Sequence, residues 1–413
     1  MVERAHPENP LERTRERMAV VESLRETFAA KEALAGATVG VASHVEPSTG
    51  IYLEALRDAG ATVLFTASNP ASTHGDVVDH LDAQAGLEAF VDPSMDHAAL
   101  DAARDELLAR EPDLLLTDGA QLAARAYAGD APTDALVGIA EQTTSGVDRL
   151  RAMADDGTLS VPALAVNHTP VKHWFDNVHG TGESLLSNLL TATNRVAAGS
   201  TVVVAGYGYV GRGIAGKARS LGADTVVTEI DPRVAVRAHM DGHRVLPMAD
   251  AAREGDVFVT ATGSRDVLRA EHFRAMCDGA LLCNAGHRAV ELGVGTLRDL
   301  AAGSEPVGEG ITRFELPDGT EIDLFADGEL GNLAGPYAQG HPAEVMDTTF
   351  AALLVAARDL WETERSPGVY ELPEELDRAV AERKLDALGL AVDDETDAQA
   401  RYRNSWRRGV DEE

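Results

Sequence analysis

The sequence predicts an α/β protein built from two doubly wound, parallel-sheet domains joined by a hinge, with a C-terminal helical tail. Two observations support this prediction. Short apolar, β-branched runs alternate with helix-like segments from residue 38 onward, and a second alternating series starts at residue 201. This order is typical of parallel sheets with helices on both faces. Ligands bind such sheets beyond the carboxyl ends of the strands.

The first series predicts strands at 38–43, 62–66, 114–117 and 136–140, a helix at 51–59, and an earlier helical segment at 11–30. Polar clusters follow several of these strands, at residues 44–49, 69–74, 118–119 and 141–146. Because parallel strands end at one edge of a sheet, we expect these clusters to lie close together.

The second series opens with a strand, Thr201 to Ala205, that leads into the G-x-G-x-x-G turn Gly206-Tyr207-Gly208-Tyr209-Val210-Gly211. A helical stretch at 214–221, a second strand at 226–228 and Glu229 follow. The acid stands close to the expected spacing of roughly 20 residues beyond the turn. Later strands are expected at 257–260 and 281–283. This order is the Rossmann dinucleotide fingerprint, which a merely structural glycine turn would not reproduce.

Each residue of that fingerprint has a physical role. Gly206 permits the tight turn, Gly208 leaves room for a pyrophosphate, and Gly211 lets the helix pack against the strand. The helix N-terminus offers N–H groups to the phosphates. Glu229 can accept hydrogen bonds from ribose hydroxyls and would repel a 2′-phosphate, so NAD is favoured over NADP.

The composition excludes some partners. The chain has 413 residues, enough for two or three domains, and a formal charge of −32 with only four lysines. Nucleic acid is therefore not an expected partner. Acids spread along the chain, with arginine in place of lysine, indicate adaptation to high intracellular salt; an ordinary acidic protein is the alternative. We expect no metal site.

The remaining composition predicts a cytoplasmic protein. There is no apolar run of about 18 residues to span a membrane, and the N-terminus has no apolar signal core. The two cysteines, Cys277 and Cys283, favour a reducing compartment over a disulfide framework.

Lys172 and Asp176 stand four residues apart before the glycine turn, so a helix would place them on one face. A lysine beside Trp174 and Phe175 in a lysine-poor chain is a functional candidate. A simple ion pair explains the spacing equally well.

The resemblance to a known family rests on several motifs in order. The chain resembles the S-adenosyl-L-homocysteine hydrolase (adenosylhomocysteinase) family over about residues 10 to 410. Its short ending is similar to the archaeal-type branch, which lacks a longer tail bearing lysine and tyrosine. The matching residues are Asn69-x-x-Ser72-Thr73, Glu141-x-Thr143-Thr144-x-Gly146-Val147, Lys172-x-x-Phe175-Asp176-Asn177, the turn at 203–213, Thr228 to Pro232, Asn284-x-Gly286-His287 and Gly340-His341-Pro342.

The resemblance implies a redox-assisted cleavage in a cytoplasmic homotetramer. Bound NAD⁺ oxidises the 3′-hydroxyl of a nucleoside thioether, which acidifies the C4′ hydrogen. Homocysteine then leaves from C5′, water adds, and the ketone is reduced again. It also implies a substrate domain at 1–182 with 339–371, an NAD domain at 183–338, and an oligomerisation tail at 372–413.

The resemblance implies residue roles as well. The catalytic residues would be Lys172 and Asp176 at the 3′- and 2′-hydroxyls, Asp118 as the base at C4′, His44 at C5′, and His287. Substrate-binding residues would be Glu46, Ser48, Thr49, Asp118, Gln142, Lys172, Asp176, His341 and Met346. NAD-binding residues would be Thr143, Thr144, Ser145, Asn177, Gly206, Gly208, Tyr209, Val210, Gly211, Glu229, Thr262, Gly263, Ala285, Gly286, His287 and Asn332. For a lone histidine, a structural hydrogen bond is the default role.

The chain departs from the family pattern around the purine and ribose. The family usually has Thr and Glu where this chain has Glu46 and Ser48, and Glu where it has Gln142. His74 replaces Gln, and Gln339 replaces Met or Thr. Glu46 could take over the acceptor role from two positions earlier, whereas Ser48 would tolerate a carbonyl on the base. S-Adenosylhomocysteine and S-inosylhomocysteine therefore both stay open as substrates.

Two other functions are compatible with the residues. One is an NAD-dependent dehydrogenase of a small hydroxy acid, although the position of the Lys172 and Asp176 pair before the nucleotide half favours the hydrolase. The other is a non-catalytic NAD-binding paralogue with an altered purine pocket that regulates a true hydrolase.

Overall fold

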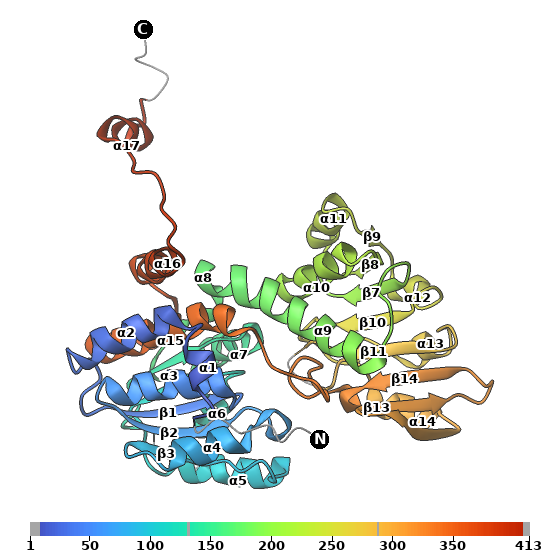
Figure 1. Ribbon diagram of the computed structural model, residues 1–413, viewed down its shortest axis with the longest axis horizontal. Helices are drawn as coiled ribbons and strands as arrows, with labels where there is room; N and C mark the ends of the chain where they lie inside the picture. The colour runs from blue at the N-terminus through green and yellow to red at the C-terminus, as the bar shows by residue number, and fades with distance from the viewer. Residues whose placement is uncertain (1–8, 130–132, 287–288, 408–413) are drawn as a thin grey trace.

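The computed structural model describes residues 9–129, 133–286 and 289–407. It contains two sheets, each covered by helices on both faces, with a helical tail beyond them (Figure 1). The predicted fold class is confirmed. His287 lies outside the described residues.

The first sheet has seven strands in the order β15-β6-β5-β4-β1-β2-β3, and all its pairings are parallel. Its edge strand β15 comes last in the chain and pairs with β6. The strands are β1 (Thr38–Ser43), β2 (Thr62–Ala67), β3 (Leu87–Ala89), β4 (Leu114–Thr117), β5 (Gly138–Glu141), β6 (Pro162–Ala165) and β15 (Gly368–Glu371).

The second sheet has eight strands in the order β12-β13-β14-β11-β10-β7-β8-β9. It is parallel from β14 to β9, but β12, β13 and β14 form an antiparallel extension that the sequence did not predict. The strands are β7 (Thr201–Ala205), β8 (Asp224–Thr228), β9 (Arg244–Val245), β10 (Val257–Thr260), β11 (Ala280–Asn284), β12 (Gly303–Gly308), β13 (Ile311–Glu315) and β14 (Glu321–Phe325).

The helices fill the connections between strands. The predicted helical segment at 11–30 is two helices, because the chain turns out of helical geometry at Met18 (ψ +51°). The helices are α1 (Glu12–Arg15), α2 (Ala19–Ala29), α3 (Pro47–Asp58), η1 (Pro70–Ser72), α4 (Gly75–Asp82), α5 (His97–Leu108), α6 (Gln121–Ala128), α7 (Thr144–Asp155), η2 (Val166–His168), α8 (Pro170–Lys172), the π-helix η3 (His173–Gly180), α9 (Thr181–Thr193), α10 (Tyr209–Ser220), α11 (Pro232–Met240), α12 (Met248–Ala251), α13 (Ala270–Phe273), α14 (Val294–Leu300), η4 (Ala326–Gly328), α15 (Ala343–Glu362), α16 (Glu374–Leu388) and α17 (Asp397–Asn404).

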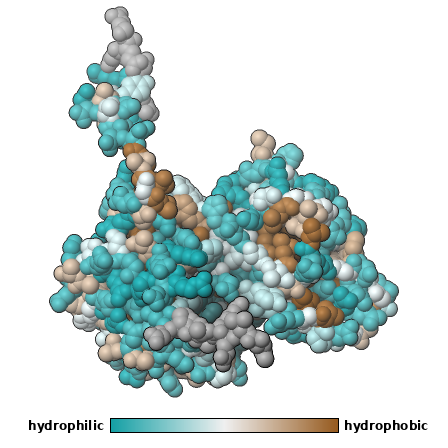
Figure 2. Space-filling view, in the orientation of Figure 1, coloured by the Kyte–Doolittle hydropathy of each residue, from teal (hydrophilic) through white to brown (hydrophobic). Residues whose placement is uncertain are grey.

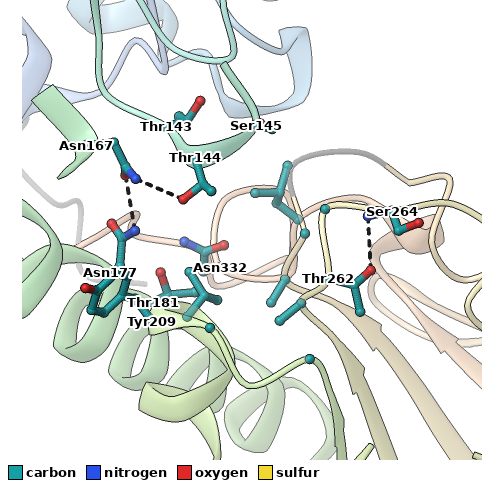
Figure 3. Close-up of a pocket in the computed structure, with 18 of the residues that line it drawn as sticks. Thr143, Thr144, Ser145, Asn167, Asn177, Thr181, Tyr209, Thr262, Ser264 and Asn332 are labelled. Carbon is teal, nitrogen blue, oxygen red and sulfur yellow. Dashed lines mark hydrogen bonds between the residues drawn. The ribbon is translucent and has the colours of Figure 1, made fainter. Parts of the chain in front are cut away.

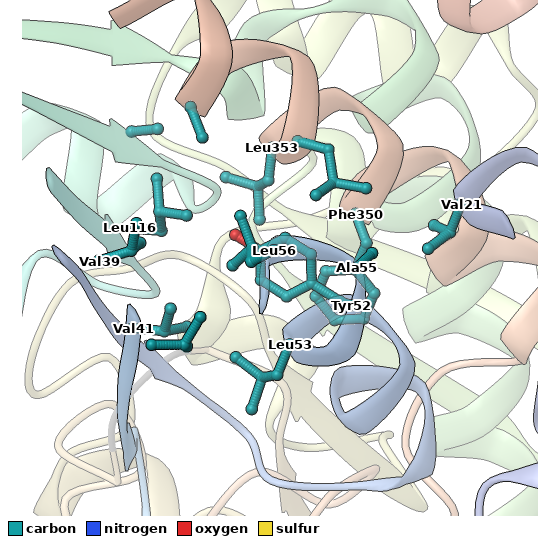
Figure 4. Packing of buried hydrophobic residues seen from close by; sticks show 14 of the residues in the cluster. Val21, Val39, Val41, Tyr52, Leu53, Ala55, Leu56, Leu116, Phe350 and Leu353 are labelled. Atoms are coloured by element: carbon teal, nitrogen blue, oxygen red, sulfur yellow. The ribbon is translucent and has the colours of Figure 1, made fainter. Parts of the chain in front are cut away.

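The largest core lies where α2, α3 and α15 cover one face of the first sheet. Tyr52 stacks on Phe350 with ring centroids 4.7 Å apart and an angle of 6° between the rings. Leu53, Leu56 and Leu353 pack around them (Figure 4). This core holds α15, which follows the second sheet in the chain, against the first sheet. The chain therefore crosses between the sheets twice.

The surface in Figure 2 is mostly hydrophilic, in keeping with the charge of −32. Apolar side chains are exposed at the end of α16 and just after it, at Leu388, Leu390 and Val392. Helix α17 lies apart from both sheets (Figure 1). Across the described ranges, the longest apolar helices fall short of what a bilayer crossing requires.

Candidate active site

A cavity of about 810 Å³ lies where strand ends of the two sheets face each other. In the first sheet, Ser43, Asp118 and Gln142 lie at the ends of β1, β4 and β5. Gly206 and Glu229 line it from the ends of β7 and β8. The cavity thus lies beyond the carboxyl ends of strands in both sheets, where parallel α/β sheets bind their ligands.

Most of the predicted site residues line this cavity. Ser48 and Gly211 do not: Ser48 lies behind Glu46, and Gly211 is buried in α10. The predicted residues in the lining are His44, Glu46, Thr49, Asp118, Gln142, Thr143, Thr144, Ser145, Lys172, Asp176, Asn177, Gly206, Gly208, Tyr209, Val210, Glu229, Thr262, Gly263, Ala285, Gly286, Asn332, His341 and Met346.

The three glycines of the turn have different surroundings. Gly206 has φ +91°, and a Cβ on it would lie 2.7 Å from the carbonyl oxygen of Ala261. A Cβ on Gly211 would lie 1.9 Å from the carbonyl oxygen of Gly206. A Cβ on Gly208, by contrast, would meet no atom within 4 Å. The space beside Gly208 is therefore open to a ligand.

Glu229 lies beside this turn. Its carboxylate accepts hydrogen bonds from the backbone N–H of Tyr207 at 2.8 Å and of Ile230 at 2.7 Å. These contacts tie the acid to the glycine turn and keep it at the edge of the cavity. An acid held there suits a ribose diol.

Several buried polar atoms in the cavity lining lack a partner. Among the described residues, Ser145 Oγ, Gln142 Oε1 and Asn332 Oδ1 are buried without a hydrogen bond. Such atoms are costly unless a ligand or water satisfies them. Figure 3 shows Ser145 and Asn332 among the polar side chains around the pocket. Together with the open space at Gly208, they fit a dinucleotide rich in hydrogen-bonding groups.

Lys172 and Asn177 begin a hydrogen-bonded chain across the site. Lys172 Nζ donates to Asn177 Oδ1 at 2.6 Å. Asn177 Nδ2 donates to Asn167 Oδ1 at 3.2 Å, and Asn167 Nδ2 donates to Thr144 Oγ1 at 2.9 Å (Figure 3). The π-helix η3 has a wider turn than an α-helix, so it favours this contact between residues five apart. The chain links the lysine to predicted NAD-binding residues.

Asp176 is buried among three partners. Its carboxylate lies 3.3 Å from Lys172 Nζ and 3.1 Å from His341 Nδ1, and it accepts a 2.7 Å bond from Thr349 Oγ1. Burial alone would raise the pKa of Asp176, but the charges of Lys172 and His341 and the hydrogen bonds outweigh it and hold that pKa well below its usual range. Asp176 is therefore ionised in the folded protein.

A second pair faces the cavity from β1 and β4. His44 Nε2 lies 3.7 Å from Asp118 Oδ2, to which Gln142 Nε2 donates at 2.9 Å. His44 Nδ1 lies 2.5 Å from Ser72 Oγ. Asp118 thus lies between an imidazole and an amide, both of which orient its carboxylate.

Two buried glutamates support the site loops, and the sequence analysis did not assign them this role. Glu141 accepts bonds from Thr117 Oγ1, the N–H groups of Gly119 and Ala120, and both the N–H and hydroxyl of Thr143. It fixes the loop that carries Asp118 to the loop that begins α7. Burial, followed by the charge of Asp118, raises the pKa of Glu141 to about 7.

The second supporting acid is Glu291. It accepts bonds from Thr262 N at 2.9 Å, Thr262 Oγ1 at 2.8 Å and Gly263 N at 2.8 Å. Asn167, which bridges Thr144 and Asn177, was also missed. For Glu141, Glu291 and Asn167, the sequence offers one signal: each is a polar residue in an otherwise apolar segment or beside a motif.

Comparison with known proteins adds to this geometry. The family model for the S-adenosyl-L-homocysteine hydrolase NAD binding domain matches residues 177–338. An adenosylhomocysteinase of Haloquadratum walsbyi is 45% identical over 97% of this chain and 93% of its own length. The chain belongs to the adenosylhomocysteinase family. The predicted family and the NAD cofactor are confirmed.

Other relatives in the family carry two different names. An adenosylhomocysteinase of Archaeoglobus fulgidus is 44% identical over 95% of this chain and 97% of its own. An S-inosyl-L-homocysteine hydrolase of Methanosarcina mazei is 42% identical, over 97% of each chain. The roles of individual residues stay predictions.

Proposed function

We propose that the protein hydrolyses S-adenosyl-L-homocysteine reversibly to homocysteine and adenosine, using bound NAD. One observation carries the proposal: the Lys172–Asp176 pair and the His44–Asp118 pair line the same cavity as the glycine turn. A small-molecule dehydrogenase needs one such acid–base pair, whereas elimination of a thioether requires a second.

The cofactor and the protein divide the chemistry. NAD, when bound, supplies reversible hydride transfer at the 3′-carbon, which makes the neighbouring C4′ hydrogen acidic. Gly208 leaves space for its pyrophosphate, Glu229 suits its ribose, and Ser145 and Asn332 offer unpartnered buried atoms to it.

Lys172 and Asp176 act at the sugar diol. Ionised Asp176 accepts a hydrogen bond from one hydroxyl and so holds the ribose in position. In its neutral amine form Lys172 takes the 3′-hydroxyl proton when the alcohol is oxidised, and the resulting ammonium returns the proton when the alcohol forms again. Both side chains are only 6% exposed, so water competes little for these contacts.

Asp118 and His44 act on the other side of the sugar. Asp118 takes the C4′ proton, and loss of homocysteine from C5′ leaves a double bond to which water adds. His44, 3.7 Å from Asp118, gives a proton to the thiolate that leaves C5′ and takes a proton from the water that adds there. His287 remains a predicted participant outside the described residues.

We further propose a cytoplasmic homotetramer adapted to high salt. The acidic charge of −32 and the identity to proteins of Haloquadratum walsbyi and Halobacterium salinarum support the salt adaptation. The exposed apolar residues Leu388, Leu390 and Val392 support a role of residues 372–413 in contacts between subunits. The proposed division into a substrate domain (1–182 with 339–371) and an NAD domain (183–338) follows the two sheets.

The experiment is a steady-state assay in molar KCl with S-adenosyl-L-homocysteine, following thiol release and absorbance at the NADH wavelength together. The proposal expects stoichiometric homocysteine and adenosine with no net NADH. Net NADH would support the dehydrogenase, and NAD binding without thioether cleavage would support the regulatory paralogue.

A further inference from the structure

Glu46 presents a buried carboxylate to the cavity from an unusual position. It precedes the first residue of α3, where a short polar side chain such as Asp or Ser ordinarily accepts bonds from the helix N–H groups. Here no such cap bond forms, and Glu46 lines the cavity while only 6% exposed. The carboxylate is thus not used to cap the helix and is available to a ligand.

Only one oxygen of this carboxylate has a protein donor. Ser48 Oγ donates to Glu46 Oε1 at 3.0 Å. Among the described residues no donor to Oε2 is found; that oxygen lies beside Gly340, where a Cβ would approach within 1.8 Å of it. Ser48, which does not line the cavity, therefore orients Glu46 and leaves Oε2 with acceptor capacity.

The surroundings of Glu46 fit the base of a nucleoside. Thr49 and Met346 line the same cavity, and Met346 offers a soft apolar surface to an aromatic ring. His341, which follows Gly340, holds Asp176 at 3.1 Å. A nucleoside whose diol lies at Asp176 can therefore reach Glu46 with its base.

We propose, resting on the proposed function, that Glu46 is the specificity-determining residue for position six of the purine, accepting a hydrogen bond from the adenine amino group. An ionised carboxylate only accepts hydrogen bonds. It therefore stabilises the 6-amino group of adenine and repels the 6-oxo group of hypoxanthine. Ser48 acts through Glu46 and is a positioning residue.

The charge state of Glu46 makes this selectivity depend on pH. Burial raises the pKa of Glu46 to about 7; Asp176 and Asp118 add to the rise, and His341 and Ser48 oppose it. A protonated carboxyl can donate to a 6-oxo group. Preference for adenine should therefore increase as pH rises through about 7.

The test measures kcat/KM for S-adenosyl- and S-inosyl-L-homocysteine from pH 6 to 8.5. It uses the NAD-loaded wild type, Glu46→Gln, and Glu106→Gln as a control on the exposed face of α5. A Gln amide can accept or donate. Loss of a hydrogen bond to a charged acceptor should lower the adenosyl-to-inosyl ratio about 10- to 100-fold at pH 8 and flatten its pH dependence. Glu106→Gln should leave both unchanged.

A wild-type ratio that favours the inosyl substrate at pH 8, or a ratio unchanged in Glu46→Gln, overturns the inference. Equilibrium binding of adenosine and inosine gives a second measurement that needs no turnover. If the wild type cleaves neither thioether, the proposed function fails, while a pH-dependent preference for adenosine still supports the inference. Should Glu46→Gln not fold, the wild-type pH dependence decides alone: a flat ratio overturns the inference.

Discussion

Replacing Lys172 with Met tests the central step of the proposed reaction. Methionine keeps the length and apolar stem of lysine but removes the amine. Asn177 loses its 2.6 Å donor, and Asp176 loses the cation at 3.3 Å. The variant therefore removes the proposed proton acceptor at the 3′-hydroxyl without creating a large cavity.

Two magnitudes follow from this geometry. A positioned acid–base group contributes about 10²- to 10⁴-fold to a rate, or about 3–5 kcal/mol of barrier. Breaking a buried pair by removing one partner destabilises by about 3–5 kcal/mol. Asp176 keeps His341 and Thr349 as partners, so we expect the lower end, about 3 kcal/mol.

The assay is thiol release at saturating S-adenosyl-L-homocysteine, with bound NAD quantified in the same preparation. Lys217→Met is a matched control, because Lys217 forms an exposed ion pair with Glu183 at 3.0 Å. Such a pair contributes about 0–1 kcal/mol, so this variant should be near wild type.

Full-speed thioether cleavage by Lys172→Met would refute the assignment of Lys172. If instead activity and NAD content fell in parallel, Lys172 would act by holding the cofactor site rather than by proton transfer. Loss of kcat with retained NAD is the result that the geometry predicts.

Three other experiments test the cofactor site, the buried acid Glu141 and the surface charge. Gly208→Ala should keep the wild-type Tm but weaken NAD binding at least tenfold by calorimetry, because its Cβ meets no protein atom and enters the space proposed for the pyrophosphate. Gly211→Ala should lower Tm, because its Cβ would lie 1.9 Å from a carbonyl oxygen. Similar Tm and NAD affinity in the two variants would contradict this interpretation. Since the pKa of Glu141 is raised to about 7, its contribution to the free energy of unfolding is largest at low pH and is lost as pH rises to about 7. In denaturant titrations Glu141→Gln should be less stable than the wild type, but its free energy of unfolding should lack about 3 kcal/mol of this decline with pH. Equal pH dependence of the free energy of unfolding in both proteins would count against this prediction. With a charge of −32, raising KCl from about 0.1 to 1 M should raise Tm by screening repulsion, and a salt-independent Tm would argue against salt adaptation.

Local patterns in the sequence were sufficient to predict the nucleotide turn. The strand 201–205 was predicted with the bounds that β7 has, because an apolar run and a glycine turn are signals within a dozen residues. The antiparallel strands β12, β13 and β14 were missed. The pairing of β14 with β11 joins segments far apart in the chain. Strand β12 reads Gly-Ser-Glu-Pro-Val-Gly, a sequence that favours turns, and it is exposed along its whole length.

The site was predictable only where a motif carried its residues. Spacing suggested that Lys172 and Asp176 share a helical face, and they lie 3.3 Å apart. Spacing did not reveal the π-helix, in which the shorter contact of Lys172 is with Asn177 at 2.6 Å. The π-helix contacts α10 and α15, which lie far from it in the chain, and no local pattern encodes such contacts.

Three buried carboxylates each occupy the space beside a glycine. A Cβ on Gly146 would lie 2.3 Å from Glu141 Oε1, one on Gly286 would lie 1.7 Å from Glu291 Oε1, and one on Gly340 would lie 1.8 Å from Glu46 Oε2. Each glycine thus leaves the volume that a carboxylate occupies, and Gly340 in addition has φ +66°, a conformation that favours glycine.

Gly286 and Gly340 therefore leave room for a buried carboxylate beside the cavity. Gly286 was predicted to contact NAD, but its missing side chain is equally required by Glu291, which holds the Thr262–Gly263 loop at the other side of the cofactor cavity. Gly340 likewise makes room for Glu46 at the second crossing between the sheets, next to His341 and its partner Asp176. Because Glu291 accepts donors from Thr262 and Gly263, a methyl group at Gly286 would displace this acid and loosen that loop. A methyl group at Gly340 would displace Glu46 from its place at the cavity. The shape of the cavity therefore depends on pairs of a glycine and a carboxylate, which lie close in the chain for Gly286 and Glu291 and far apart for Gly340 and Glu46.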